Sequence, residues 1–376
     1  MTLITPRTLK GFRDLTPAQA RRREHLILRV AKAFRRHGYS PIETPALEYA
    51  EILKGKGGEE SDKLLYEFED QGGRPVALRF DLTVPLARYV AQHQGQLVFP
   101  FRRYHVGPVW RAERPQKGRF REFVQCDADL VGAVGPAADA EMLVVMDAAY
   151  VALDIGRVTL RFNDRRVLTG LLESIGATEH AVPALRALDK LDKQGADAVA
   201  QEMVTAGLTE DQATRLLDAT RPGDDDPDTL AGLAEAVRGS ALGEEGVEAL
   251  GRVRDLVMAG GVDPERIQID PRIARGLDYY TGIVFEARFT EAPAFGSVGG
   301  GGRYDDLAGI YTKTSLPGVG GSVGIDRLLA ALEEKEGGST AFSSADIMVA
   351  HPEPDRLAAA FALASGLRAR GFAVEV

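Results

Sequence analysis

Positively charged side chains gather between positions 102 and 121 of a chain whose formal net charge is −9. Seven Arg or Lys residues fall there with a single acid, Glu113, and the basic residues are Arg102, Arg103, Arg111, Arg114, Lys117, Arg119 and Arg121. A local basic site on an acidic protein suits a ligand that carries phosphate, or one defined contact with nucleic acid. The overall charge argues against a general nucleic-acid coat protein.

The second half of this stretch continues into a predicted strand, residues 120–130, along which polar and apolar residues alternate. One face carries Arg119, Arg121, Phe123, Gln125, Asp127 and Asp129, and the other carries Phe120, Val124, Cys126, Ala128 and Leu130, which suit a core. A polar face is costly to bury without partners, so it must meet solvent or line a site. A solvated face is the ordinary interpretation. An aromatic ring among cations, with amide and carboxylate groups beyond it, favours a nucleotide site instead.

The elements that would position this strand alternate along the chain. Proline after Thr16 begins a predicted helix that ends at Gly38. Further predicted strands are 76–80, 104–112, 158–162, 267–269 and 283–289, and further helices are 82–91, 137–152 and 325–334. Residues 165–260 have helical spacing throughout. Strands on both sides of a helical insertion predict an α+β fold with one mainly antiparallel sheet flanked by helices.

The expected domain organisation follows from these elements. Residues 1–164 and 261–334 form two parts of a core around the inserted helical subdomain 165–260, and 335–344 form a linker. Residues 345–376 begin a partial C-terminal α/β domain with a helix at 355–370, whose apolar face carries Leu357, Phe361, Ala364 and Leu367. We expect this last domain to be incomplete, with a natural or an engineered shortening both open.

Four other segments could carry chemistry. Residues 275–286, RGLDYYTGIVFE, combine an arginine, two tyrosines and two acids, which suits a zwitterion with an imidazole, although the tyrosines could equally be half-buried strand residues. Residues 78–83, LRFDLT, taken alone are a strand end before a helix. The glycine-rich stretches 299–302 and 318–324 predict loops, or tight strand packing, where backbone approaches a ligand. No GxxxxGK[ST] sequence is present and GxGxxG fails at Val323, so a nucleotide site would be neither a P-loop nor a Rossmann site.

Metal and compartment signals are sparse. The six histidines have no ligand spacing and no HExxH occurs, so we expect no protein-held metal. The single cysteine, Cys126, fits a reducing cytoplasm. No apolar run approaches the roughly 20 residues that span a bilayer, and no secretory signal is recognisable. We therefore expect a cytoplasmic protein without a membrane partner.

Arg111-Ala-Glu113, followed by Arg119 and Phe123, resembles motif 2 of the class II aminoacyl-tRNA synthetases. The whole string RAERPQKGRFREFVQCDADLVG is similar to the histidyl-tRNA synthetase family in particular, and so is RGLDYYTG. The second glycine-rich stretch with Arg327 resembles motif 3, and motif 1 is matched loosely around Pro45. The resemblance extends almost continuously over residues 8–334, and residues 345–376 match only the opening β-α-β of the family's anticodon-binding domain.

This resemblance implies roles for individual residues. The catalytic residues would be Arg275 and Arg111. The ATP site would consist of Arg111, Glu113, Arg119, Phe123 and Arg327. The histidine site would consist of Asp81, Thr83, Gln125, Asp129, Tyr279 and Tyr280. Contacts with the tRNA acceptor end would come from Arg114, Gln116 and Lys117. Asp81 stands where some bacterial members carry glutamate, so its carboxylate is on a shorter side chain.

The implied activity is formation of histidyl-adenylate from histidine and ATP with Mg²⁺, followed by transfer of the histidyl group to tRNA(His), by a homodimer. A competing interpretation is a non-catalytic paralogue that regulates the ATP phosphoribosyltransferase of histidine biosynthesis, which the short C-terminus keeps open. A third is a synthetase-like domain that senses tRNA without charging it. The complete set of phosphate-binding arginines favours the enzyme.

Overall fold

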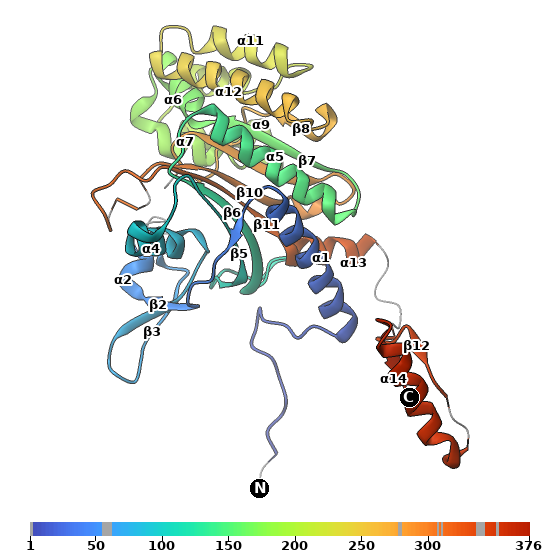
Figure 1. Cartoon of the computed structure of the whole chain (residues 1–376). Helices are drawn as coiled ribbons and strands as arrows, with labels where there is room; N and C mark the ends of the chain where they lie inside the picture. The colour runs from blue at the N-terminus through green and yellow to red at the C-terminus, as the bar shows by residue number, and fades with distance from the viewer. Residues whose placement is uncertain are drawn as a thin grey trace.

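The computed structural model describes residues 3–54, 62–276, 280–306, 308–309, 311–335, 343–350 and 353–376. Its centre is an eight-stranded sheet (Figure 1). In spatial order the strands are β1 (Ser40–Pro41), β5 (Phe101–Trp110), β6 (Glu122–Val131), β11 (Gly318–Gly324), β10 (Ser297–Tyr304), β9 (Ile283–Phe289), β7 (Val158–Asp164) and β8 (Ile267–Ile269). Only the outermost pairs, β1 with β5 and β7 with β8, are parallel. The predicted α+β fold with a mainly antiparallel sheet is confirmed.

One face of this sheet is covered by α1 (Pro17–Arg36), α5 (Pro136–Leu153) and α13 (Ile325–Lys335) (Figure 1). Helix α1 begins as predicted, because Thr16 and Gln19 form a reciprocal capping box. Its buried Phe34 and Met146 of α5 belong to one core with Cys126 and Leu130 of β6. The apolar face predicted for β6 is therefore the face that packs against the helices.

A second, three-stranded sheet in the order β2 (Leu47–Tyr49), β4 (Pro75–Leu78) and β3 (Tyr66–Glu69) precedes β5 in the chain. With α2 (Ala50–Leu53) and α4 (Thr83–His93) it forms a separate core, which includes Leu86 and also Val131 and Tyr304 from the central sheet. The single-turn 3₁₀ helices of the described chain are Gln94–Gln96, Thr178–His180, Pro264–Arg266, Pro293–Phe295 and Pro354–Arg356.

The chain between β7 and β8 is helical, as predicted, and is called the helical segment below (top of Figure 1). Its helices are α6 (Arg165–Ser174), α7 (Ala181–Leu188), α8 (Leu191–Gln194), α9 (Ala196–Thr205), α10 (Glu210–Ala219), α11 (Asp226–Ala236) and α12 (Ala241–Ala259). Helix α12 packs on both α6 and α5, so the segment is attached to the helices of the central core.

The C-terminal residues form β12 (Ile347–Met348), α14 (Leu357–Arg368) and β13 (Val374–Glu375), with the two strands parallel. The predicted order of elements is confirmed, but the predicted apolar face of α14 is partly wrong. Ala364 is buried, whereas Leu357 and Phe361 are 41% and 55% exposed, and Ala360 is buried instead. Two short strands cover only a narrow stripe of the helix, and small residues occupy that stripe.

The two glycine-rich stretches are strands, so the alternative of tight strand packing is confirmed and the alternative of loops is wrong. Gly300 of β10 pairs with Ser322 of β11, and both strands lie in the middle of the sheet. Interstrand hydrogen bonds outweigh the low strand propensity of glycine here. Among the described helices, none is both long and apolar enough to cross a membrane.

Candidate active site

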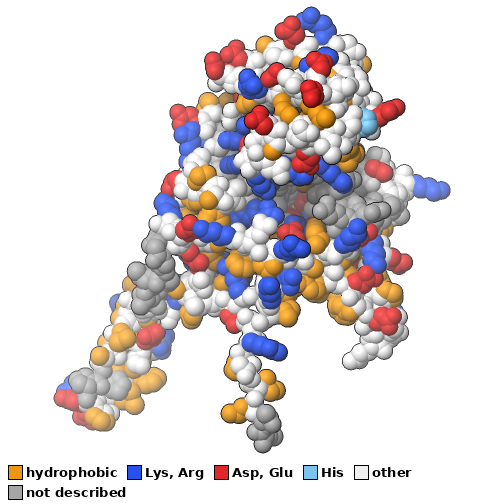
Figure 2. All heavy atoms as spheres, turned by 180° about the vertical axis from the view of Figure 1, so that it is seen from behind, with side chains coloured by type: hydrophobic (Ala, Val, Ile, Leu, Met, Phe, Trp, Pro, Cys, Tyr) orange, Lys and Arg blue, Asp and Glu red, His pale blue; other side chains and the backbone are white. Residues whose placement is uncertain are grey.

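A cavity of about 410 Å³ opens on the face of the central sheet opposite α1 and α5. Gln125, Asp127 and Asp129 line it from β6, because they alternate with the core-facing Cys126 and Ala128. Seen from this side, Lys and Arg side chains gather in the hollow below the helical segment (Figure 2). The alternation predicted from the sequence therefore places the polar residues of β6 in a site and not on a solvated face.

The floor of the cavity is largely backbone. Glycines of β10 and β11 line it, namely Gly299, Gly300, Gly301, Gly320, Gly321 and Gly324. A Cβ atom on Gly320 would overlap the Oδ1 atom of Asp129. Glycine is thus required where the sheet backbone comes close to a polar group of the site.

Four arginines line one side of the cavity, and we call them the arginine end: Arg111, Arg119, Arg275 and Arg327. Burial, and then the positive charges of Arg119 and Arg275, lower the pKa of Arg327 to about 10. The Arg327 guanidinium donates to the backbone oxygen of Ser297, which fixes its position. Cations that repel one another in a half-buried space favour a polyanionic ligand.

Aromatic rings hold the central arginine in place. The guanidinium carbon of Arg111 lies 4.3 Å from the centre of the Phe80 ring and 5.1 Å from that of Phe123. Its Nε donates to the Phe80 backbone oxygen at 3.1 Å. Glu113 Oε2 lies 3.7 Å from Nη1 of Arg119. The arginine end therefore also presents an aromatic face and a carboxylate, which a purine requires for stacking and for its amino group.

The other side of the cavity, the carboxylate end, consists of Gln125, Asp127 and Asp129. Gln125 Nε2 donates to Ser322 Oγ at 2.9 Å. Asp129 accepts a hydrogen bond of 2.6 Å from the Tyr304 hydroxyl and forms an ion pair of 2.7 Å with Arg103. These contacts come from three neighbouring strands, β5, β10 and β11, so the carboxylate end is rigid.

Burial perturbs the titration of this end. It raises the pKa of Asp127 to about 7, against the lowering effect of Arg103 and with a further rise from Asp129. Oδ1 of Asp127 has no hydrogen-bond partner among the described residues. His105, directly opposite on β5, has its pKa lowered to about 3 by burial and by Arg103 and Arg79. The carboxylate end thus contains a carboxyl group that titrates near neutral pH beside a neutral imidazole.

Asp81, Thr83 and Tyr280 complete the lining between the two ends. Asp81 Oδ1 accepts from the backbone N–H groups of Thr83 and Val84 at 3.0 and 2.9 Å. The first turn of α4 therefore holds the Asp81 carboxylate in a fixed orientation beside the cavity. Tyr280 packs against the core of the smaller sheet as well as lining the site.

The structure brings eleven residues named from the sequence around this one cavity: Asp81, Thr83, Arg111, Glu113, Arg119, Phe123, Gln125, Asp129, Arg275, Tyr280 and Arg327. The expected acceptor-end contacts Arg114, Gln116 and Lys117 lie instead on an exposed turn beside it. Lys117 Nζ pairs there with Glu334 at 2.5 Å. Tyr279 lies outside the described residues.

Two expectations about β6 were wrong. Arg121 was placed on the polar face, but its guanidinium donates to the backbone oxygens of Glu113 and Lys10, away from the cavity lining. Phe120 was placed on the core face, but it lines the cavity under the guanidinium of Arg13. Both residues precede Glu122, where the strand begins, so the alternation does not apply to them.

Asp127, Ser322 and Tyr304 line the cavity, but none of them has a role predicted from the sequence. The strand alternation puts Asp127 on the polar face with Gln125 and Asp129, so a role for it could have been predicted. Ser322 and Tyr304 reach the site only through the pairing of β6, β11 and β10, which no local pattern predicts.

Comparison with known proteins agrees with this geometry. The sequence profile of the family described as histidyl-tRNA synthetase matches residues 11–328. A histidine–tRNA ligase of Rhodopirellula baltica is 50% identical over all of this chain and 85% of its own length.

Solved structures show the same fold. The histidyl-tRNA synthetase of a Nostoc species superposes with a TM-score of 0.88 at 32% identity, over 99% of this chain and 86% of its own. A Bacillus halodurans protein described as an ATP phosphoribosyltransferase regulatory subunit/histidyl-tRNA synthetase superposes with a TM-score of 0.82 at 24% identity, over 99% and 93%, and supports the fold alone. With the profile match and the 50% identical relative, the chain belongs to the histidyl-tRNA synthetase family.

Proposed function

We propose that this protein activates histidine with ATP to histidyl-adenylate and then transfers the histidyl group to the 3′ end of tRNA(His). The observation that carries the proposal is the division of one cavity. Its arginine end suits a triphosphate, and its carboxylate end suits a cationic, hydrogen-bonding amino acid. Both ends share the polar face of β6, so the two substrates would lie side by side.

At the arginine end the residues take the roles that the family resemblance implies. Arg111 binds the α-phosphate and the substrate carboxylate, and Arg275 also binds the α-phosphate. Arg119 and Arg327 bind the γ-phosphate. Phe123 stacks on adenine and Glu113 accepts from its amino group. The fixed positions of Arg111 and Arg327 support these assignments, since a preorganised cation stabilises developing charge without reorganisation.

At the carboxylate end, Gln125 and Asp129 contact the histidine amino group and side chain, and Asp81 with Thr83 holds the α-amino group. Tyr280 lines the histidine pocket, and the same role is proposed for Tyr279. Oδ2 of Asp81 is the atom we assign to the substrate ammonium, because Oδ1 accepts from the first turn of α4. Discrimination would come from buried polar groups that an incorrect amino acid leaves unpaired.

The first step is an in-line displacement. A carboxylate oxygen of histidine bonds to the α-phosphorus, and the bond from that phosphorus to the bridging oxygen breaks, releasing pyrophosphate. A ribose hydroxyl of the terminal tRNA nucleotide then attacks the activated carbonyl carbon, and AMP leaves. No side-chain nucleophile is needed, so the barrier would be lowered by positioning and by Arg111 and Arg275 near the reacting phosphate.

Mg²⁺ would accompany ATP and neutralise phosphate charge. Among the described residues no group of three or more His, Cys, Asp or Glu side chains could hold a metal ion. Mg²⁺ keeps several waters and is bound largely through substrate phosphates, so ATP itself would supply most of its ligands. Glu113, which lies 3.7 Å from Arg119, would be a carboxylate close to this phosphate-bound ion.

The macromolecular contacts are part of the same proposal. The exposed turn with Arg114, Gln116 and Lys117 would meet the acceptor end of tRNA(His), because it adjoins the arginine end and carries positive charge. The protein would act as a homodimer in the cytoplasm. We also propose the domain boundaries that the sequence predicts, with residues 335–344 as a linker.

Histidine-dependent exchange between ATP and pyrophosphate tests the proposal. Each of the twenty amino acids is supplied in turn, and we expect exchange with histidine alone. Arg111→Ala should reduce it by at least a hundredfold. A protein that binds ATP but gives no exchange with histidine would be a binding protein, as the regulatory alternative requires.

A further inference from the structure

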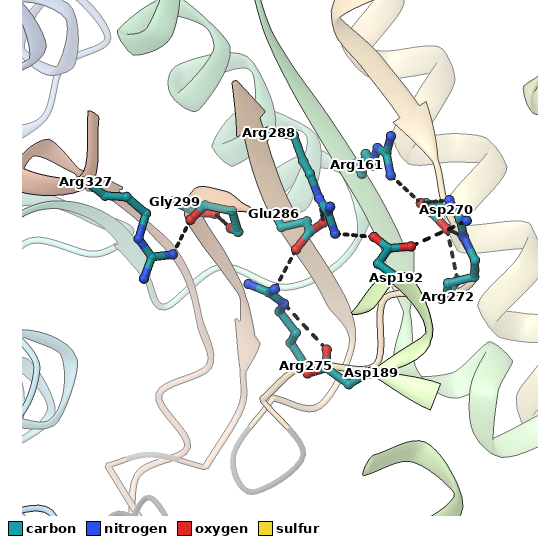
Figure 3. Close-up of polar contacts among 11 residues, drawn as sticks. Arg161, Asp189, Asp192, Asp270, Arg272, Arg275, Glu286, Arg288, Gly299 and Arg327 are labelled. Carbon is teal, nitrogen blue, oxygen red and sulfur yellow. Dashed lines mark hydrogen bonds and ion pairs between the residues drawn. The ribbon is translucent and has the colours of Figure 1, made fainter. Parts of the chain in front are cut away.

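Arg275 is held by two carboxylates that come from different parts of the chain (Figure 3). Its Nη2 lies 3.0 Å from Oε2 of Glu286 on β9, and its Nε lies 3.6 Å from Oδ1 of Asp189 in the helical segment. Glu286 is buried, whereas Asp189 and Arg275 are about half exposed, with 43% and 39% of their side-chain surfaces accessible. Arg275 thus connects the sheet to the helical segment at the edge of the cavity.

A second route joins the same two parts. The other oxygen of Glu286, Oε1, accepts from Arg288, and Arg288 Nη2 lies 2.5 Å from Asp192. Asp192 also lies 3.7 Å from Arg272. Figure 3 shows these side chains from β9 and from the helical segment pointing toward one another. Glu286 is therefore shared between the cavity arginine and a cation held by the helical segment.

The helical segment presents these two acids from a fixed position. Asp189 directly follows α7, whose C-terminal residues Leu185 and Leu188 are buried. Asp192 lies in the next short helix, α8. Arg165 at the start of α6 donates to the backbone oxygen of Gly276, the neighbour of Arg275. Displacement of α7 relative to the sheet would therefore change the environment of Arg275 directly.

We propose that Asp189 of the helical segment is a positioning residue for Arg275, so that this segment sets the orientation of a cation needed for adenylate formation. The proposal rests on the function proposed above. Among the described residues, loss of Asp189 would leave Glu286 as the one anchor of Arg275, and Arg288 binds the other oxygen of that carboxylate. Asp189 supplies the second anchor at Nε and holds the guanidinium plane toward the arginine end.

Energetics distinguish positioning from stabilisation. An ion pair with both partners this exposed contributes little to folding free energy. The geometry of a group at a reacting phosphate, in contrast, affects the rate strongly. A variant of Asp189 should therefore lose catalytic rate while it keeps its thermal stability, a combination that a merely structural residue would not produce.

The test measures pyrophosphate exchange by the full chain, with ATP varied at saturating histidine and histidine varied at saturating ATP. We expect Asp189→Asn to lower kcat about tenfold, to leave KM for histidine within twofold and to leave the thermal midpoint close to that of the wild type. Asp189→Glu, which restores the charge, should recover most of the rate. In the background of Arg275→Ala, Asp189→Asn should have no further effect, because both changes act on the same cation.

Glu202→Gln is the matched control. Glu202 pairs with Lys190, the immediate neighbour of Asp189, and the two side chains are 37% and 43% exposed, much like the Asp189 pair. This variant removes a similar ion pair from the same segment at a distance from the cavity lining, so kcat should not change.

The outcomes separate the two proposals. No histidine-dependent exchange by the wild type would overturn the proposed function, and the positioning role with it. Normal wild-type exchange with an unchanged kcat for Asp189→Asn would overturn the positioning role alone. Equal losses in Asp189→Asn and Glu202→Gln, or multiplicative losses with Arg275→Ala, would also overturn it.

Discussion

Arg103 and Asp129 form an ion pair of 2.7 Å beneath the carboxylate end, and both side chains are almost completely buried. Arg103 also donates to the backbone oxygen of Leu82, and Asp129 accepts from Tyr304. A buried charge without its partner is strongly unfavourable, so this pair ties the histidine-binding role proposed for Asp129 to the stability of the sheet.

Replacement of one partner should therefore be costly. We expect Arg103→Leu to lower the free energy of unfolding by about 3–5 kcal/mol, because it leaves Asp129 buried and unpaired. Urea unfolding measures this change. Lys54→Met, which removes the half-exposed pair with Glu67, should cost no more than about 1 kcal/mol. Similar losses for the two variants would contradict the special role of the buried pair.

The close approach of Gly320 to Asp129 gives a second prediction. Gly320→Ala would push the Asp129 carboxylate from its position, since the added Cβ overlaps Oδ1. Loss of one charge-assisted hydrogen bond to histidine, about 1.5–3 kcal/mol, corresponds to a rise in KM for histidine of about tenfold or more. KM for ATP should change much less. Gly232→Ala on α11, where nothing lies within 4 Å of the added atom, should leave both constants unchanged. Equal rises in the two constants for Gly320→Ala would argue for a general distortion of the sheet.

The aromatic face at the arginine end can be tested separately. Phe123→Ala should raise KM for ATP roughly tenfold, in line with about 1–3 kcal/mol for stacking of a base on an aromatic ring. Phe123→Trp should preserve most of the affinity, and KM for histidine should stay constant in both. A selective effect on histidine would assign this ring to the other substrate.

The titration of Asp127 predicts a pH-dependent stability. Its folded pKa of about 7 lies above its ordinary value of 3.8. Between these values the folded protein retains a proton that the unfolded chain has lost, so the free energy of unfolding falls as pH rises from about 4 to 7 and this contribution is constant above. The variant Asp127→Asn lacks this carboxyl group and therefore lacks its pH-dependent contribution to stability.

The measurement compares urea unfolding of the two proteins at several pH values. The stability of Asp127→Asn relative to wild type should increase by at most about 1.4 kcal/mol per pH unit across that window. The comparison between variants matters because His105, whose lowered pKa has the opposite effect, contributes equally to both proteins. A constant difference from pH 4 to 7 would mean that Asp127 titrates normally.

Much of the site could be predicted from local patterns. The alternation from Phe123 to Asp129 placed three polar side chains on one face, because a strand has a period of two wherever it exists. It failed at Phe120 and Arg121, which precede the strand, since the pattern itself carries no information about where pairing begins. The helix start at Thr16 was predictable for the opposite reason, because capping depends only on neighbouring residues.

Other features depend on partners far along the chain. Glycine has no side chain to indicate a strand, so β10 and β11 form strands only because β6 and β9 supply hydrogen bonds on either side. The sequence alone determined which side chains could form the site, namely its arginines, its aromatic ring and its carboxylates. It also showed the family resemblance. Tertiary structure decided which of them share a cavity. It also joined Arg275 and Glu286, which are close in the sequence, to Asp189 far earlier in the chain, because these side chains meet only when the sheet and the helical segment pack together.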